Sequence, residues 1–358
     1  KLMKNSFSQI KEILKDAKKG KMFILVDDDD RENEGDLVIP GSKCNSEKIN
    51  FMAKHGRGLI CLALTSKKVK KLNLPLMSSI NKSRTQTAFT VSIESKKGIS
   101  TGISAKDRAK TIKVAIKPSS SKNNIVTPGH VFPLVARDGG VLERAGHTEA
   151  SVDISKLAKL NPSAVICEVM NEDGTMARYK DLIPFAKKHK LKIAKIEDLI
   201  SYRLKNEKLV KCISTKKIKI KKFGFFDLKT FRNKLDSSEH YTISKGKFTP
   251  NKPARVRVIS TNVLSNFYNF KNDNFKDSLK YLNRFNSFAL ILIKGKNLNL
   301  SSENSKILRY YGIGAQIIKE LRLRKMILVS RSIKRVIALD GYGIKITKQE
   351  IMKWKKFV

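Results

Sequence analysis

Hydrophobic positions near the start of the chain recur at the spacing of an α-helix. The apolar residues that would share one helical face within residues 6–19 are Phe7, Ile10, Ile13, Leu14 and Ala17. Ser6 or Ser8 can cap the start of this helix, and Gly20 can end it. The pattern therefore predicts an amphipathic helix.

Strand and helix patterns then alternate as far as about residue 203. Short apolar or alternating runs, which are typical of strands, lie at 22–26, 37–41, 58–64, 88–94 and 165–170. Helical spacing returns at 46–55, 105–117 and 181–190. Interleaved strands and helices of this kind indicate an α+β fold built from mixed α/β layers.

The length of 358 residues and the hydrophobic content of 41% are enough for two domains, each with its own core. After the last helical pattern the chain enters a Lys-rich segment at 205–222. We place the domain boundary near 203–212. This gives one domain over residues 1–205 and a second over residues 206–358.

The chain contains no run of about 18 apolar residues, the length that a membrane-spanning helix needs. Its basic first 21 residues have neither an apolar core nor a small-residue cleavage site. The four cysteines, Cys44, Cys61, Cys167 and Cys212, lack ligand spacing and are too few for a disulfide framework. We therefore expect a soluble cytoplasmic protein with reduced thiols.

The formal net charge of +42 raises the possibility of a nucleic-acid partner. The excess is densest in residues 206–358, which hold 35 Lys and Arg against 10 Asp and Glu. The whole chain is rich in Lys, Ile and Asn, which favours a drift in composition over one selected basic surface. No known nucleic-acid motif is present, so a nucleic-acid partner is not expected, but a basic binding protein stays open as an alternative.

Seven carboxylates and one arginine lie in the ten residues from Asp27 to Asp36, directly after a predicted buried strand. Such density is unfavourable unless a cation or a buried partner is present. In an extended loop, Glu32, Glu34 and Asp36 would share one face and could offer oxygen ligands to a metal. The alternative interpretation is a charged surface hairpin.

Two histidines, His130 and His147, each follow a glycine in segments that we interpret as loops. Around His147, the residues Arg144 to Thr148 offer a guanidinium, an imidazole, a hydroxyl and backbone N–H groups. This set suits a phosphate or a metal-bound sugar oxygen. A single histidine is more often a structural group, and that interpretation remains open here.

Glu168 lies within the apolar run 165–170, which predicts a buried carboxyl group. Burial raises the pKa of a carboxyl group. A group of this kind can serve as a general acid or base near neutral pH.

Five blocks, in order, resemble the signatures of 3,4-dihydroxy-2-butanone 4-phosphate synthase over about residues 6–203. The blocks are MFILVDDDDRENEGDLVIP, HGRGLICLAL, TGISAKDRAKTI, PGHVFPLVARDGGVLERAGHTEAS and CEVMNEDGTMAR. The resemblance implies a homodimeric lyase that converts ribulose 5-phosphate to 3,4-dihydroxy-2-butanone 4-phosphate and formate with Mg²⁺ or Mn²⁺.

The same resemblance implies a role for particular residues. Glu32 and His147 would be the metal ligands, and His130 and Glu168 would be the essential catalytic groups. The substrate would be bound by Arg31, Glu32, Asp36, Arg144, Ala145, Gly146, His147, Thr148 and Glu168. Residues expected near the site, without a defined role, are Cys61, Thr101 and Asp107. Thr85 departs from the family, which often has an aromatic residue or histidine there.

In the second half, residues 255–260 and 311–346 resemble GTP cyclohydrolase II, a family whose zinc is held by three cysteines. The sequence has no cysteine after Cys212, and His240 is the only histidine of this half. Tetrahedral catalytic zinc needs about three protein ligands. We therefore predict a cyclohydrolase II-like domain of α/β type that lacks zinc ligands and cyclohydrolase activity.

Three roles remain open for such a domain. It could be a scaffold that stabilises the dimer or complements a separate GTP cyclohydrolase II, which is the role we favour. It could bind a nucleotide or RNA, or it could be in decay. The GxG at Gly312 and Gly314 is weak evidence for phosphate binding, because such a pair is more often part of a turn.

Overall fold

The computed structural model describes residues 7–28, 31–83, 85–261, 273–294, 303–332 and 342–352. Asp29 and Asp30 of the acidic segment lie outside these residues, as do residues 333–341 of the segment 311–346 that resembles GTP cyclohydrolase II. The chain forms two compact units, and the main division between them lies between Tyr202 and Arg203.

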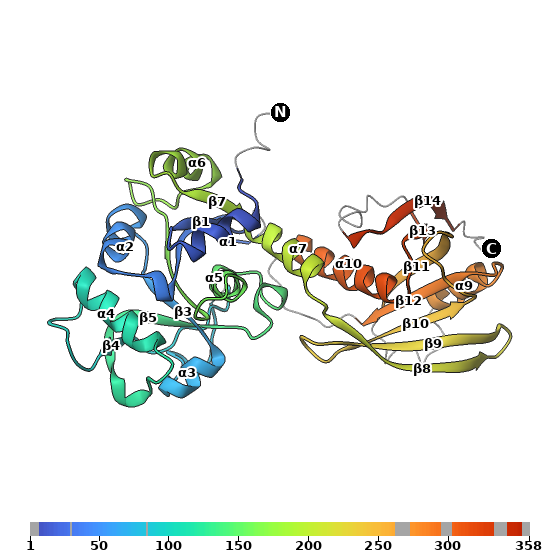
Figure 1. Cartoon of the computed structure of the whole chain (residues 1–358), viewed down its shortest axis with the longest axis horizontal. Helices are drawn as coiled ribbons and strands as arrows, with labels where there is room; N and C mark the ends of the chain where they lie inside the picture. Colours follow the sequence, from blue (N-terminus) through green and yellow to red (C-terminus); the bar gives the residue numbers. More distant parts are fainter. Residues whose placement is uncertain are drawn as a thin grey trace. The chain divides into compact units, whose positions relative to one another are not determined.

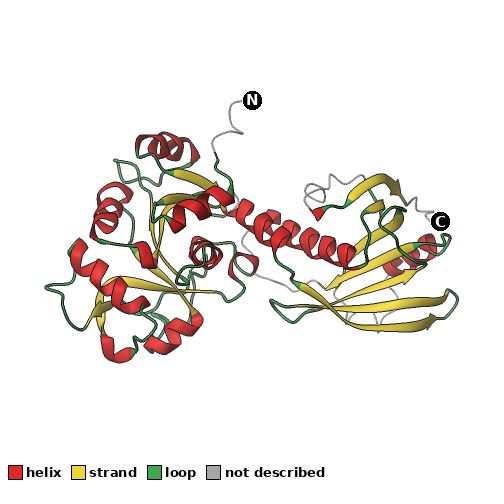
Figure 2. Cartoon of the chain, in the orientation of Figure 1, coloured by secondary structure: helices red, strands yellow, loops and turns green. Residues whose placement is uncertain are grey.

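Among the described residues, the first unit contains a seven-stranded sheet in the order β4-β5-β3-β6-β2-β1-β7 (Figures 1 and 2). Its strands are β1 (Phe23–Val26), β2 (Gly35–Pro40), β3 (Cys61–Thr65), β4 (Ile93–Ser95), β5 (Ile125–Ala136), β6 (Ser163–Glu168) and β7 (Lys192–Lys195). The β3–β5 and β1–β7 pairs are parallel, and the other pairs are antiparallel. This mixed sheet confirms the predicted fold class.

The helices of this part of the chain are α1 (Ile10–Lys18), α2 (Ser46–Phe51), α3 (Ser66–Leu72), α4 (Ala105–Ile116), α5 (His147–Leu157), α6 (Tyr179–Lys188) and α7 (Ile196–Asn206). A π-helical turn, Met52–Gly56, extends α2. The predicted first helix is confirmed as α1. The strand predicted at 88–94 is largely wrong, because Phe89 and Thr90 form only isolated bridges, to Leu134 and Leu76.

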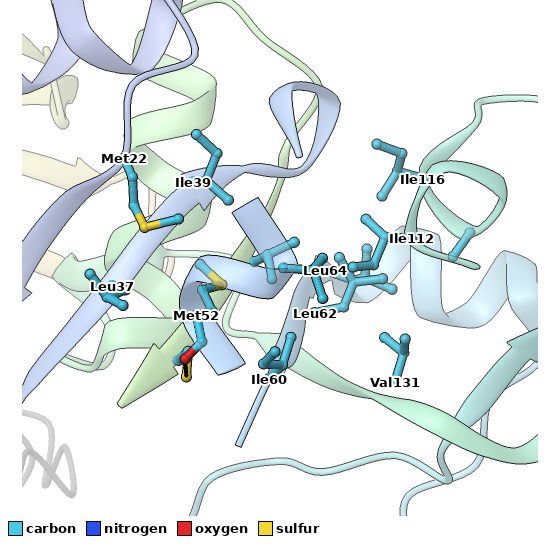
Figure 3. Close-up of a cluster of buried hydrophobic side chains, with 14 of the residues drawn as sticks. Met22, Leu37, Ile39, Met52, Ile60, Leu62, Leu64, Ile112, Ile116 and Val131 are labelled. Atoms are coloured by element: carbon cyan, nitrogen blue, oxygen red, sulfur yellow. Dashed lines mark hydrogen bonds between the residues drawn. The ribbon is translucent and has the colours of Figure 1, made fainter. Parts of the chain in front are cut away.

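A hydrophobic core lies between one face of this sheet and the helices α2, α4 and α6. Ile49 of α2, Ile112 of α4 and Leu182 of α6 are buried in it. Figure 3 shows the part where Leu62 and Leu64 of β3 meet the helical side chains. Asn45, Thr65 and Ser104 cap the starts of α2, α3 and α4 with their side-chain oxygens.

The helix α5 covers strands on the other face of the sheet. All its residues from His147 to Ser155 are buried. Small residues make this close packing possible, because Ala63 of β3 and Ala136 of β5 meet Val152 of α5. The predicted metal ligand His147 is therefore the first residue of a helix that is buried over most of its length.

In the second unit, the described strands form a seven-stranded sheet in the order β14-β13-β11-β12-β10-β9-β8. They are β8 (Val210–Ile220), β9 (Gly224–Asn233), β10 (Glu239–Lys245), β11 (Ala254–Thr261), β12 (Phe288–Lys294), β13 (Lys325–Ser330) and β14 (Lys345–Ile351). The strands from β14 to β12 are parallel, and β10, β9 and β8 continue antiparallel.

Among the described residues, the helices that cover this second sheet (Figure 2) are α9 (Asp273–Leu282) and α10 (Glu303–Glu320). Ile317 and Ile318 of α10 pack in one hydrophobic core and Leu279 and Leu282 of α9 in another. The second unit is therefore an α/β layer structure, as predicted for the second half.

Candidate active site

The turn that follows β1 is organised around the carboxylate of Asp27, a side chain that is 1% exposed. Asp27 Oδ1 accepts a hydrogen bond from the Glu34 backbone N–H at 2.9 Å, and Oδ2 accepts one from the Glu32 N–H at 3.3 Å. Asn33 takes a left-handed φ of 53°, which asparagine tolerates better than most residues. The turn is thus compact, and the assumption of an extended loop was wrong.

Arg31 joins two acidic residues of this turn. Its Nη1 atom lies 2.6 Å from Asp27 Oδ2 and 2.6 Å from Glu32 Oε2. Asp27, Arg31 and Asp36 are all buried. The alternative interpretation was a charged surface hairpin. The strands β1 and β2 do form an antiparallel hairpin around this turn, but these three charged residues are buried within it.

One group of possible metal ligands occurs among the described residues, namely Asp27, Glu32 and His147. One ligand atom from each lies within 4.8 Å of the others. Two carboxylates are donors that Mg²⁺ accepts, and an imidazole with carboxylates also suits Mn²⁺. The donor set therefore fits a divalent cation.

Sequence reasoning named Glu32 and His147 as ligands but missed Asp27. The position of Asp27 in the sequence could have indicated this role. Asp27 is the first acidic residue after the buried strand β1 and so has the least freedom to turn toward solvent.

The imidazole of His147 is held in one orientation at the start of α5. Its Nε2 lies 3.2 Å from the carbonyl oxygen of Leu25, so Nε2 donates its proton there and Nδ1 keeps its lone pair. Burial lowers the pKa of His147, which favours the neutral ring that a metal requires. Asp36 Oδ1 lies 3.7 Å from Nδ1.

Asp36 of β2 and Glu168 of β6 are direct neighbours across two antiparallel strands. Leu37 and Cys167 point into the core on the helix α2 side, so the alternation along each strand directs Asp36 and Glu168 to the α5 side. Burial, and then the charge of Glu168, raises the pKa of Asp36 well above its usual value. Burial also raises the pKa of Glu168, as predicted for this residue.

The Glu168 side chain is fixed by the glycine-containing segment before β3. Its Oε2 accepts a hydrogen bond from the Leu59 backbone N–H at 2.9 Å. A Cβ atom added at Gly58 would lie 2.6 Å from the same Oε2, which is too close. Gly58 therefore provides the space that Glu168 occupies.

His130 lies on β5, so the prediction that it belongs to a loop was wrong. Its Nδ1 contacts the carboxylate of Glu94, a residue that sequence reasoning did not name. No interaction described in the structure joins His130 to the Asp27 group. The strand β3 lies between β5 and β6, which separates His130 from Glu168 by two strand spacings, about 10 Å.

Asp107 supports the Glu94 side of the site. Its carboxylate accepts hydrogen bonds from the Ser100 hydroxyl at 2.7 Å and the Gly102 N–H at 3.1 Å, and these bonds lower its pKa. Gly102 directly abuts Glu94, where no Cβ would fit. Thr101, in contrast, is exposed.

Arg144 is oriented by a carboxylate and by a distant loop. Its Nη1 donates to Glu149 Oε2 at 2.6 Å, and its Nη2 donates to the Thr85 carbonyl and the Thr87 hydroxyl, both at 2.9 Å. Thr85, the departure from the family pattern, thus contacts Arg144 through its backbone.

The residues Ala145, Gly146 and Thr148 surround the start of α5. Backbone N–H groups in the first turn of a helix have no helical partner and favour anions. Cys61 lies on the neighbouring strand β3, where burial raises the pKa of its thiol, so it remains protonated at neutral pH.

A family model described as 3,4-dihydroxy-2-butanone 4-phosphate synthase matches residues 11–202, which is more than half of the chain. The chain belongs to this family. A second model, described as GTP cyclohydrolase II, matches residues 280–350. The resemblances drawn for both halves of the chain are confirmed.

Relatives match nearly the full length of the chain. Riboflavin biosynthesis protein RibBA of Aquifex aeolicus is 43% identical, over 97% of this chain and 93% of its own length. The 3,4-dihydroxy-2-butanone 4-phosphate synthase of Photobacterium phosphoreum is 42% identical, over 96% of this chain and 99% of its own.

Solved structures of the family agree with the fold. RibBX from A. baumannii, described as a two-domain 3,4-dihydroxy-2-butanone 4-phosphate synthase, has a TM-score of 0.83 and 40% identity, covering 97% of this chain and all of its own. A synthase solved with two magnesium ions has a TM-score of 0.54 and 37% identity, over 56% of this chain and 98% of its own. Within the described residues, no helix has the length and apolar character to cross a membrane.

Proposed function

We propose that this chain is a lyase that converts D-ribulose 5-phosphate to L-3,4-dihydroxy-2-butanone 4-phosphate and formate in riboflavin biosynthesis. The observation that carries the proposal is the convergence of Asp27, Glu32 and His147 within 4.8 Å in a chain of this family. Substrate and products balance in atoms and electrons, so no oxidant or organic cofactor is needed.

A divalent cation, Mg²⁺ or Mn²⁺, would be held by Glu32 and His147, with the Asp27 carboxylate within reach. When bound, the cation would act as a Lewis acid toward the substrate oxygens. The related synthase solved with two magnesium ions supports the choice of a divalent cation.

Proton transfer is assigned to Glu168 and His130. Burial raises the pKa of Glu168, which favours the protonated form of its carboxyl group and suits a group that takes a proton and returns it to the substrate. His130 would exchange protons at Nε2, because Glu94 engages Nδ1. Asp36, whose pKa is also raised, would hold a substrate hydroxyl beside Glu168.

The phosphate of the substrate would be bound near the start of α5. Arg144 and the backbone N–H groups around Ala145, Gly146 and Thr148 offer donors for an anion. Arg31 would contribute a second guanidinium from the turn after β1. The buried packing of α5 excludes water from the side of the site that it covers.

The first test is formate release from ribulose 5-phosphate by the purified chain with Mg²⁺, compared with EDTA. We expect metal-dependent formate, and Glu168→Gln should reduce turnover by about 10²-fold or more. Folded wild-type protein that releases no formate would refute the assignment.

For the second unit we propose a scaffold without GTP cyclohydrolase activity. The support is the lack of any cysteine after Cys212 in the sequence, since the family's zinc site needs three. No described observation favours a nucleic-acid- or nucleotide-binding role. Because relatives named RibBA share this unit, formate release from GTP should be assayed, and a positive result would contradict the proposal.

We further propose functional domains over 1–205 and 206–358, a cytoplasmic homodimer, and possible cooperation with a separate GTP cyclohydrolase II. The change between compact units at Arg203 supports the boundary. Sedimentation of the purified chain tests the dimer, because a monomeric mass at micromolar concentration would exclude it.

A further inference from the structure

The segment after Glu168 folds into a tight hairpin loop. Thr175 donates its backbone N–H to Asp173 Oδ1 at 2.9 Å and its hydroxyl to the same atom at 2.7 Å. Gly174 takes a φ of 85°, a left-handed value that suits glycine. The Ala177 N–H returns to the Val169 carbonyl at 3.0 Å. The loop therefore brings its last residue, Arg178, back beside the end of β6.

The backbone of Arg178 is itself anchored. It is the residue before α6, and its N–H donates to Asp181 Oδ2 at 2.9 Å. The backbone of Arg178 is thus fixed at the start of a helix, although its side chain is 45% exposed.

The guanidinium of Arg178 forms hydrogen bonds with the turn that carries Glu32. Its Nη1 donates to the carbonyl oxygens of Glu32 and of Asn33, the latter at 2.8 Å, and lies 3.5 Å from Glu34 Oε1. Asp27 binds the N–H groups of the same turn. The turn is therefore held through its carbonyl groups by Arg178 and through its N–H groups by Asp27.

We propose that Arg178 is a positioning residue for the metal site, which presets the carboxylate of Glu32 toward His147 before a cation binds. This inference rests on the proposed function, because it concerns the same cation. Arg178 touches neither the ligand atoms nor any candidate proton carrier in the interactions described. Its effect passes through the backbone of the turn, so it governs metal affinity and leaves proton transfer unchanged.

Binding of Mn²⁺, followed by electron paramagnetic resonance, tests the proposal without an activity assay. We expect Arg178→Ala to weaken Mn²⁺ binding by about 10- to 100-fold, the usual effect of losing a group that supports a metal ligand. Arg178→Lys should recover part of the affinity, since an ammonium group can donate to one or both carbonyls. Lys180→Ala, which removes one exposed charge two residues away, is the matched control and should bind Mn²⁺ like the wild type.

Formate release adds a second readout. If Arg178 only positions the turn, saturating Mg²⁺ should restore the kcat of Arg178→Ala to within about threefold of wild type. The Mg²⁺ concentration that gives half of the maximal rate should be higher in this variant than in the wild type. Wild-type Mn²⁺ affinity in Arg178→Ala would overturn the inference, as would a kcat that stays low at every Mg²⁺ concentration. If the wild-type chain itself binds no Mn²⁺ and releases no formate, the proposed function fails, and this inference fails with it.

Discussion

The Nδ1 atom of His130 contacts the carboxylate of Glu94, and Gly102 and Gly129 provide the space for the Glu94 side chain, because a Cβ atom added at either glycine would lie too close to it. A carboxylate at one ring nitrogen fixes the histidine tautomer and leaves the other nitrogen for proton exchange. Glu94 therefore orients the catalytic candidate His130.

Replacing Glu94 by Gln should lower kcat by about 10²-fold, because the amide cannot stabilise a protonated imidazole. Formate release at saturating substrate is the measurement. Glu47→Gln on α2 removes one charge away from the described site and should keep wild-type turnover. An unchanged kcat in Glu94→Gln would contradict the assigned orientation.

The variant Gly58→Ala should displace Glu168, since the new methyl group would lie 2.6 Å from both its Oε2 and its backbone oxygen. A misplacement of about 1 Å can reduce turnover by about 10²-fold. The kinetic comparison is with Gly314→Ala on α10, where the nearest atom to an added Cβ is 3.4 Å away. Equal turnover in both variants would show that the close contact between Gly58 and Glu168 is not needed for activity.

Changing Asp27 to Asn removes a negative charge from the ligand group and weakens the bonds that form the turn. We expect the Mn²⁺ dissociation constant to rise by about 10- to 100-fold. Calorimetric titration measures this, with Asp16→Asn on α1 as the control. Retained affinity would remove Asp27 from the metal site.

The free energy of unfolding should depend on pH through His240. Burial lowers the pKa of this histidine to about 4. An unfolded histidine has a pKa of about 6.5, so between about 6.5 and 4 only the unfolded chain takes up the proton. The stabilisation is complete above about pH 6.5 and is lost as pH falls toward 4, by about 3 kcal/mol at most.

Urea unfolding at pH 7 and pH 5 measures this dependence. His240 Nδ1 accepts the Lys294 N–H at 3.2 Å, a bond that Asn can partly replace, so His240→Asn should fold and lose much of the slope. An identical slope in the variant would assign the effect to other groups.

The local pattern of apolar and polar residues predicted the helices and strands well. It predicted the contacts of the site residues less well. The runs that became β1, β2 and β6 each contain consecutive apolar residues, FILV, LVIP and AVIC, because these parts of the strands are buried on both faces. The run 88–94 alternates just as a strand does, yet Phe89 and Thr90 form only isolated bridges, and alternation does not specify a partner strand.

The site depended on long-range contacts that spacing cannot supply. Glu32 and His147 are far apart in the sequence, and only the family resemblance joined them. Asp27 looked like one of several equivalent carboxylates, and its distinction is burial. Glu94 and Arg178 were not named because their partners, His130 and the Glu32 turn, lie on other elements.

The helix α5 is buried from its first residue, His147, to Ser155. The residues that follow His147 in the sequence are therefore held by packing in the core. The proposed metal ligand therefore lies at the edge of the hydrophobic core. Repacking of the helix interior would therefore act on cation affinity directly, and the strength of cation binding would report on how well this layer of the fold is formed.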